Sequence, residues 1–273
     1  MLTKNQGKQS QSKTQWKNIF FTAFVVALAI IVFFVQSNER KENMVEMSTP
    51  IIVGFPLKGE WLSPNTPGTK IPSHGTNQLG TTYAYDFIQV DWNRIGRPAY
   101  RVGFLQYLLF GATLDKYYGY GQAVYAPCDG VVVKAQDGYE ENTRTNLFSD
   151  LSNAYKNAHF FNPQIDDIQV IAGNYIIIQY DTNVYAALCH LQKGSIQVTV
   201  GQEIRKGDII GRVGHSGNSF APHLHFQLMD SYDIETANGM PCAFEKYEIF
   251  QDGEWKAVIN GIPSNKDRIR FQE

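Results

Sequence analysis

The tripeptide His223-Leu224-His225 carries the side chains of this chain best suited to metal chemistry. On a strand, the two imidazoles project from the same face, with Cα atoms roughly 6.5–7 Å apart. This spacing suits a division of labour in which one imidazole binds a metal and the other handles protons beside the metal's open position. The flanking Gly-x-Ser-Gly-Asn-Ser-x-x-Pro turn favours this interpretation over two ordinary histidines on a strand edge. The motif predicts a zinc hydrolase and leaves the two roles open.

Three further residues stand in contexts that fit such a site. His190 ends an apolar strand pattern, where an imidazole can polarise water or stabilise an oxyanion, although a structural histidine is the alternative. His74 lies in a loop, and Asp86 lies among aromatic residues on a strand pattern. An unpaired buried carboxylate is costly, so Asp86 requires a metal or a hydrogen-bond network. His74 and Asp86 can complete a set of two histidines and one aspartate.

The elements that must position these residues are closely spaced strands. Turn residues at 127–130, 181–183 and 206–208 separate them, and such short connections indicate antiparallel pairing. Aromatic residues, which strands favour, make up 13% of the chain. The sequence therefore predicts a mainly β fold with an antiparallel core. The expected strands are 123–126, 130–135, 174–180, 184–190, 195–200, 208–213 and 223–228.

Two stretches interrupt this strand pattern, residues 92–120 and 137–170. We interpret them as insertions that shape a binding site, with weak helical character at 147–159 in the second. The three cysteines, at positions 128, 189 and 242, include no CxxC pair, which excludes a cysteine zinc knuckle and leaves one disulfide open.

The N-terminal residues predict a membrane anchor. Residues 19–35 are uncharged and would span roughly 25 Å as a helix. Four lysines and no acidic residue precede this run, which places the basic tail 1–18 in the cytoplasm and the rest of the chain outside. A buried core helix and a cleaved signal peptide, which would give a secreted protein, are the alternatives. Residues 36–49 then form a stalk, and 50–273 form the exported domain.

The charge of the chain argues against one class of partner, nucleic acids. The chain has 24 basic and 26 acidic residues, and four of the basic residues precede position 18. The remainder is net acidic, without the basic footprint of a nucleic-acid-binding protein. We therefore expect no nucleic-acid partner.

Several phrases of the sequence together resemble a known family. They are Val124-Tyr-Ala-Pro-Cys-Asp-Gly-Val-Val-Val133, Gly173-Asn-Tyr-Ile-Ile-Ile178, Tyr185 through Leu191, Val200 through Gly211, and Ser216-Gly-Asn-Ser through Pro222-His-Leu-His-Phe-Gln227. In order and wording the chain resembles the lysostaphin-type (LytM-like) zinc metallopeptidases, which cut peptide stems or bridges of peptidoglycan. The resemblance covers a β-sheet core at 122–228 and a ligand segment at 74–86, and it implies a fold of the duplicated hybrid motif type.

The resemblance also implies roles for single residues. His74, Asp86 and His225 would bind one Zn²⁺, and His190 and His223 would be the catalytic imidazoles. The chain departs from the family pattern in the gap between the first two ligands, which is twelve residues from His74 to Asp86 instead of four. We interpret the extra residues as a longer loop.

Three further positions near these motifs have expected roles of their own. Asp91 is the alternative carboxylate if Asp86 faces inward. His215 replaces a residue that is more often small or polar, and we expect it at the rim of the site and not among the ligands. Cys128 replaces a small residue, and we expect it to serve packing.

The resulting hypothesis is a membrane-anchored, exported zinc metalloendopeptidase that hydrolyses peptide bonds of peptidoglycan. The main alternative is a non-catalytic member of the same fold that serves as a scaffold or activator of another wall hydrolase. A third hypothesis, a carbohydrate- or small-ligand-binding β-protein whose HxH motif binds a structural metal, does not explain the contexts of His74 and His190.

Overall fold

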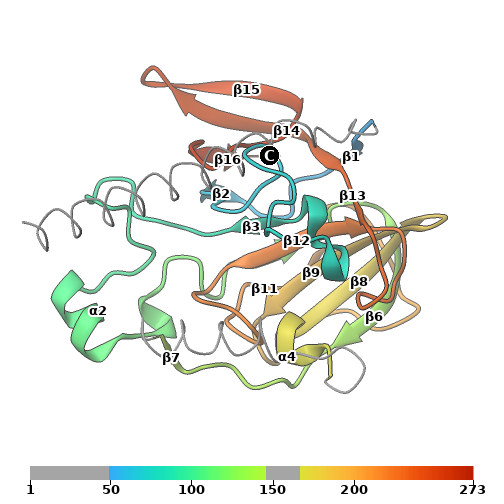
Figure 1. Cartoon of the computed structure of the whole chain (residues 1–273), viewed down its shortest axis with the longest axis horizontal. Helices are drawn as coiled ribbons and strands as arrows, with labels where there is room; N and C mark the ends of the chain where they lie inside the picture. Colours follow the sequence, from blue (N-terminus) through green and yellow to red (C-terminus); the bar gives the residue numbers. More distant parts are fainter. Residues whose placement is uncertain (1–48, 146–166, 273) are drawn as a thin grey trace, which may run out of the picture. The chain divides into compact units, whose positions relative to one another are not determined.

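Strand β12 (Leu224–Met229), which carries the second histidine of the HxH motif, lies inside the principal sheet of the computed structural model (Figure 1). The structure describes residues 49–145 and 167–272. Within these ranges the sheet has seven strands, and β12 pairs antiparallel with β9, β13 and β3. The order along the sheet is β10 (Glu203–Ile204), β6 (Gly130–Gln136), β8 (Asn174–Asp181), β9 (Val184–Leu191), β12 and β13 (Gly239–Met240), with β3 (Tyr85–Phe87) beside β12.

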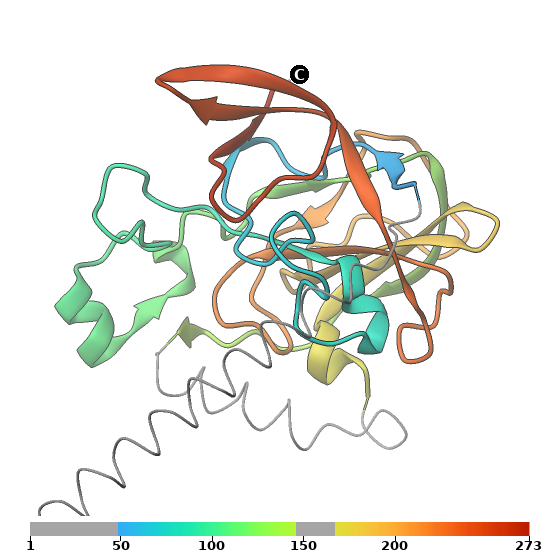
Figure 2. The same ribbon diagram turned by 45° about the horizontal axis from the view of Figure 1, so that its top comes forward.

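A second sheet uses both ends of the described chain. Long strand β14 (Cys242–Gln251) follows β13 directly and forms a hairpin with β15 (Glu254–Gly261), which is separated from the principal sheet in Figures 1 and 2. Strand β14 pairs with β1 in parallel, whereas the other ladders of this sheet are antiparallel. The other strands of this sheet are β1 (Ile51–Val53), β2 (Gly59–Trp61) and β16 (Ile269–Phe271).

Short elements complete the description. Two small ladders join β5 (Ala123–Tyr125) to β11 (Ile209–Arg212) and β4 (Ala112–Thr113) to β7 (Arg144–Thr145). The helical segments of the described residues are η1 (Gln78–Tyr83), α2 (Phe104–Phe110), η2 (Leu114–Lys116) and α4 (Gln169–Ala172). The prediction of a mainly β, antiparallel fold is therefore confirmed.

The core explains why β12 presents polar residues on one face only. Leu224, Phe226 and Leu228 are fully buried in the main hydrophobic cluster. Side chains alternate along a strand, so His225 and Gln227 lie on the opposite face. The apolar half of the strand fixes the direction in which the polar half points, because a slip by one residue would bury the histidine face in this cluster.

One expected strand is wrong. Residues 195–200 carry no strand assignment, although the other expected strands correspond to β5, β6, β8, β9, β11 and β12. In this segment Val198 is buried and Ile196 packs on the core, but a single backbone bond, from Gln197 N to Ile210 O, joins it to β11. The alternating pattern reflected burial without a hydrogen-bonded ladder.

The first predicted insertion leaves apolar surface exposed. Helix α2 exposes Phe104, Leu105, Leu109 and Phe110 by 65–69%. The predicted helical character at 147–159 lies outside the described residues, as do the basic tail, the anchor 19–35 and almost all of the stalk. Among the described residues, no helix has the length and apolar character needed to cross a membrane.

Candidate active site

The three predicted metal ligands converge on one point. Asp86 on β3 pairs directly with His225 on β12, and its Oδ1 lies 2.9 Å from His225 Nδ1. Its other oxygen, Oδ2, lies 3.0 Å from His74 Nε2. One donor atom from each of the three residues lies within 4.8 Å of the others. Asp91, the alternative carboxylate, is outside this group and accepts a hydrogen bond from the Tyr118 hydroxyl.

The twelve-residue gap between His74 and Asp86 is closed at its base. The Ser73 amide donates to Thr82 O at 2.9 Å, and the Ser73 hydroxyl donates to Thr81 O at 3.1 Å. The residues between these contacts form a side loop, and the chain reverses at Leu79 and Gly80, which both have positive φ. His74 is therefore held close to Asp86 although the sequence separation is long.

Hydrogen bonding fixes which nitrogen of His74 is free to bind a metal. The single proton of the Ser73 hydroxyl is donated to the Thr81 carbonyl, so Ser73 Oγ can only accept from His74 Nδ1, 3.0 Å away. With its proton on Nδ1, neutral His74 carries its lone pair on Nε2. That lone pair faces Asp86 Oδ2.

The same reasoning applies to His225. The Leu79 carbonyl can only accept, so the amide nitrogen of Gln227 donates to it at 2.8 Å. Gln227 Oε1 then accepts from His225 Nε2 at 2.8 Å. With Nε2 protonated, the lone pair of neutral His225 is on Nδ1 and faces Asp86 Oδ1.

This donor set fits a divalent metal ion. Two imidazole lone pairs lie about 3 Å from the oxygens of one carboxylate, and acceptors so close repel unless a cation lies among them. Tetrahedral zinc with bonds of about 2.1 Å places its ligand atoms roughly 3.4 Å apart. Two histidines and one aspartate are also a set that leaves a fourth position open. The residues present are therefore suited to a zinc ion.

The imidazoles around Asp86 stabilise its charged form. Burial acts to raise the pKa of Asp86, but the charge of His223 and the hydrogen bonds from His223, His225 and His74 outweigh it and hold this pKa well below its usual range. Asn65 adds a hydrogen bond from Nδ2 to Asp86 Oδ2 at 2.7 Å. The carboxylate is thus ionised and fixed in place.

The two remaining imidazoles lie beside this group. The rings of His190 and His223 are 4.7 Å apart between centroids, and His223 Nε2 is 3.4 Å from Asp86 Oδ1. His190 donates from Nδ1 to Ser216 O at 2.9 Å, and His223 donates from Nδ1 to Ala221 O at 2.7 Å. Both neutral rings therefore carry their lone pair on Nε2, which leaves this nitrogen available for proton transfer.

A β-bulge directs His190 toward the site. On β8, Asn174 and Ile176 are two positions apart, but their partners Leu191 and Leu188 on β9 are three apart. The extra residue lies at His190, whose φ is 61°. Leu188 and Leu191 both enter the main core, whereas strict alternation would have sent His190 there beside Leu188. Burial and the neighbouring charges of His223 and His225 lower the pKa of His190 well below its usual range, so this ring is neutral at pH 7.

The prediction that His215 lies at the rim is wrong. The residue is fully buried, and its Nδ1 lies 3.0 Å from Ser219 Oγ, which also contacts His223 Nδ1 at 3.1 Å. Within the described residues, His215 Nε2 has no hydrogen-bond partner. His215 therefore lies in the interior and is linked to His223 through the Ser219 hydroxyl.

Burial of His215 predicts acid sensitivity. Burial and then the charge of His223 lower its pKa from 6.5 to about 4. Between these values the unfolded chain binds a proton that the native state does not, so the free energy of unfolding falls as the pH falls from 6.5 to 4, by about 3 kcal/mol. We expect His215→Asn to flatten this part of the profile, as measured by urea unfolding of the metal-free protein at pH 7 and pH 4. Equal pH dependence of the two proteins would contradict the prediction.

The three cysteines are free and buried, so the possible disulfide is not formed. The prediction that Cys128 serves packing is confirmed, since it belongs to the main hydrophobic cluster. Asn65, Ser73 and Gln227 are site residues that the sequence reasoning missed. Of these, only Gln227 could have been found from the sequence, because a residue two positions after His225 lies on the same face of the strand.

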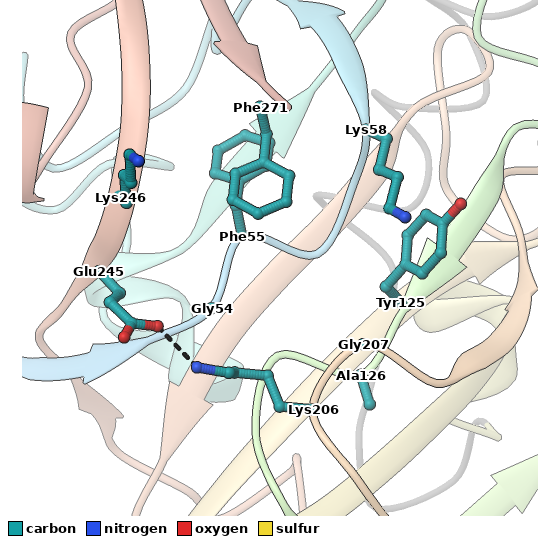
Figure 3. Close-up of a pocket in the computed structure, with 10 residues that line it drawn as sticks. All are labelled: Gly54, Phe55, Lys58, Tyr125, Ala126, Lys206, Gly207, Glu245, Lys246 and Phe271. Carbon is teal, nitrogen blue, oxygen red and sulfur yellow. Dashed lines mark hydrogen bonds and ion pairs between the residues drawn. The ribbon is translucent and has the colours of Figure 1, made fainter. Parts of the chain in front are cut away.

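A pocket elsewhere in the described chain has no such chemistry. Its volume is about 160 Å³, and Lys206 in its wall forms an ion pair of 2.7 Å with Glu245 (Figure 3). Phe55 and Tyr125 also line it, but no histidine does. The candidate active site is therefore defined by the histidine cluster and not by this pocket.

Comparison with known proteins finds a family match within this chain. Residues 161–237 match Peptidase family M23. The resemblance to the lysostaphin-type metallopeptidases is confirmed. The M23 match includes His190, His223 and His225, whereas His74 and Asp86 precede it.

The chain is also similar to individual proteins. It is 40% identical over 58 residues to the peptidoglycan DD-endopeptidase ShyA of Vibrio cholerae, which is 21% of this chain and 13% of that protein. It is 33% identical over 94 residues to endolysin 2638A of Staphylococcus phage 2638A, 32% of this chain and 19% of the relative. The matched segments thus span less than a fifth of these relatives. Against the catalytic domain of lysostaphin from Staphylococcus simulans, the identity is 19% over 67% of this chain and 88% of that chain, with a TM-score of 0.33.

Proposed function

We propose that this chain is a zinc-dependent endopeptidase that hydrolyses peptide bonds in the stems or cross-bridges of peptidoglycan. The observation that carries the proposal is the convergence of two imidazole lone pairs and one carboxylate beside two further imidazoles. The fold would be of the lysostaphin type. Relatives named as peptidoglycan endopeptidases support the class of substrate.

His74, Asp86 and His225 would hold the zinc ion, which lowers the pKa of a bound water and polarises the scissile carbonyl. His190 and His223 lie next to this position, and each ring in its neutral form carries its lone pair on Nε2. One of them would take the proton of the attacking water on Nε2, and the other, when protonated on Nε2, would donate a hydrogen bond to the developing oxyanion or protonate the leaving amine. Their bonds to the Ser216 and Ala221 carbonyls hold a proton on Nδ1 of each ring, so Nε2 is the nitrogen that would gain or lose a proton.

The non-catalytic alternative receives no support from these residues. A scaffold or activator needs neither the metal ligands nor the two further imidazoles. This chain retains all five side chains in one cluster, with the rings of His190 and His225 5.9 Å apart between centroids.

The test is hydrolysis of purified peptidoglycan by the full chain in detergent, with fragments identified by mass spectrometry. We expect peptide-bond cleavage that stops when a chelator has removed the metal and returns with added Zn²⁺. Substrates with D-configured stem peptides and with glycine bridges would identify the bond. Undiminished cleavage by protein shown to be metal-free would overturn the proposal.

We further propose that residues 19–35 hold the protein in the cell membrane, with the N-terminus in the cytoplasm and the catalytic domain on the wall side. The uncharged run and the lysines that precede it support this orientation. Protease added outside intact cells should degrade the domain and spare the N-terminal tail. A domain that is protected until the cells are lysed would contradict this orientation, and release of the domain into the medium would indicate a cleaved signal peptide.

A further inference from the structure

Gln227 makes two hydrogen bonds that join different parts of the site. Its side-chain nitrogen donates to Leu79 O in η1, and its side-chain oxygen accepts from His225 Nε2, both at 2.8 Å. The residue is 2% exposed, so water does not replace a missing partner. One side chain thereby contacts both a candidate metal ligand and the loop that follows the other histidine ligand.

The first bond decides how His225 faces the metal position. Because the Leu79 carbonyl cannot donate, the orientation of the Gln227 amide is fixed, and its oxygen must face His225. This oxygen requires the His225 proton to be on Nε2. Nδ1, the nitrogen that faces Asp86, is then the one left free to bind a metal.

The bond to Leu79 O also fastens the long loop between His74 and Asp86 to β12. Packing shows that the loop lies directly on this strand. A Cβ at Gly80 would lie 2.7 Å from Gln227 Nε2 and 3.0 Å from Met229 Cγ. The backbone there has φ of 71°, which also favours glycine. The extra residues of the loop are thus packed against the site by the side chain that orients His225.

We propose that Gln227 is a positioning residue of the metal site, which sets the tautomer of His225 and anchors the loop between His74 and Asp86. The inference rests on the proposed function only in taking these residues as the zinc ligands. Outer partners of metal-binding histidines typically change metal affinity by about 10–100-fold when they are removed. Gln227 is such a partner for His225, and through Leu79 it also holds the segment that follows His74.

The test compares two substitutions at this position in the full chain. Gln227→Met has a similar length and forms neither bond, whereas Gln227→Glu keeps an oxygen that accepts from His225. Zinc affinity is measured by competition with a chromogenic chelator. We expect Gln227→Met to bind zinc about 10–100-fold more weakly and Gln227→Glu to recover most of the loss. The matched control is Gln122→Met, which removes an exposed amide bond to Tyr118 O and should leave zinc affinity unchanged.

Two readouts separate positioning from general destabilisation. Hydrogen exchange in the metal-free protein should accelerate in residues 76–83 of Gln227→Met and remain unchanged in β8. The ¹⁵N shifts of His225 in the zinc-loaded wild type should show the proton on Nε2. A proton on Nδ1, or zinc affinity of Gln227→Met within threefold of wild type, would overturn the proposal. The wild-type measurement decides the matter even if Gln227→Met does not fold.

These readouts do not depend on peptide hydrolysis. If the wild type binds zinc but cleaves no peptidoglycan, the proposed function fails, and the comparison of zinc affinities still tests Gln227.

Discussion

Replacing His225 with alanine is expected to remove the bound metal and to lower peptide-bond hydrolysis by at least about 10³-fold. The imidazole supplies one of three ligands, and its Nδ1 lies 2.9 Å from the carboxylate of Asp86. A catalytic metal contributes several kcal/mol of transition-state stabilisation, and each 1.36 kcal/mol is a factor of ten in rate. Metal content by mass spectrometry and the rate of peptidoglycan cleavage check both parts of the prediction.

The fold should survive this change. The pairing of β12 with β3 and β9 uses backbone groups, and the apolar residues of β12 that enter the core are untouched. Circular dichroism of the variant should therefore match that of the wild type. If His225→Ala retains one zinc ion per chain and full activity, His225 is not a ligand.

Replacing His223 with alanine is expected to separate catalysis from metal binding. Its Nε2 is 3.4 Å from Asp86 Oδ1, but the residue is not one of the three whose donor atoms converge. Loss of a positioned general acid or base typically costs about 10²–10⁴-fold in rate. We expect kcat to fall by that factor while the zinc content stays at one per chain, and His190→Ala should behave similarly.

His215→Asn is the matched control for this prediction. It changes a histidine of the same buried cluster, but one that lies behind His223, with Ser219 between them. Asparagine can maintain a hydrogen bond to Ser219, so we expect a change in kcat of less than about tenfold. A His223→Ala protein with wild-type kcat would remove this residue from the mechanism and would favour the non-catalytic alternative.

The chemistry of the site could be predicted from the sequence because it depends on residue type and short spacing. Alternation predicted that His223 and His225 share one face, and in the structure His225 lies on β12 opposite Leu224 and Phe226, with His223 directly before the strand. The glycine-rich turn before the HxH motif and the strand that carries His190 could also be predicted from the sequence. Short-range alternation is a local property, so a single sequence contains it.

Positions that depend on contacts distant in sequence could not be predicted. The prediction of a rim position for His215 was wrong because its side chain is fully buried. The strand predicted at 195–200 was wrong because burial of alternate residues does not by itself produce a hydrogen-bonded ladder. His190 faces the site through a bulge that becomes visible only when β9 is paired with β8. Partners such as Asn65, 21 residues from Asp86, have no local signal at all.

The sequence by itself determined the donor types, the antiparallel strands and the face on which the HxH motif lies, because all three follow from local periodicity. The tertiary structure decided whether a loop of twelve residues still brings His74 to Asp86. It does so because Ser73 binds Thr81 and Thr82 at the base of the loop and Gln227 holds Leu79 at its tip. It also decided which nitrogen of each ligand is free, because fixed carbonyl acceptors at Thr81 and Leu79 determine where the imidazole protons lie.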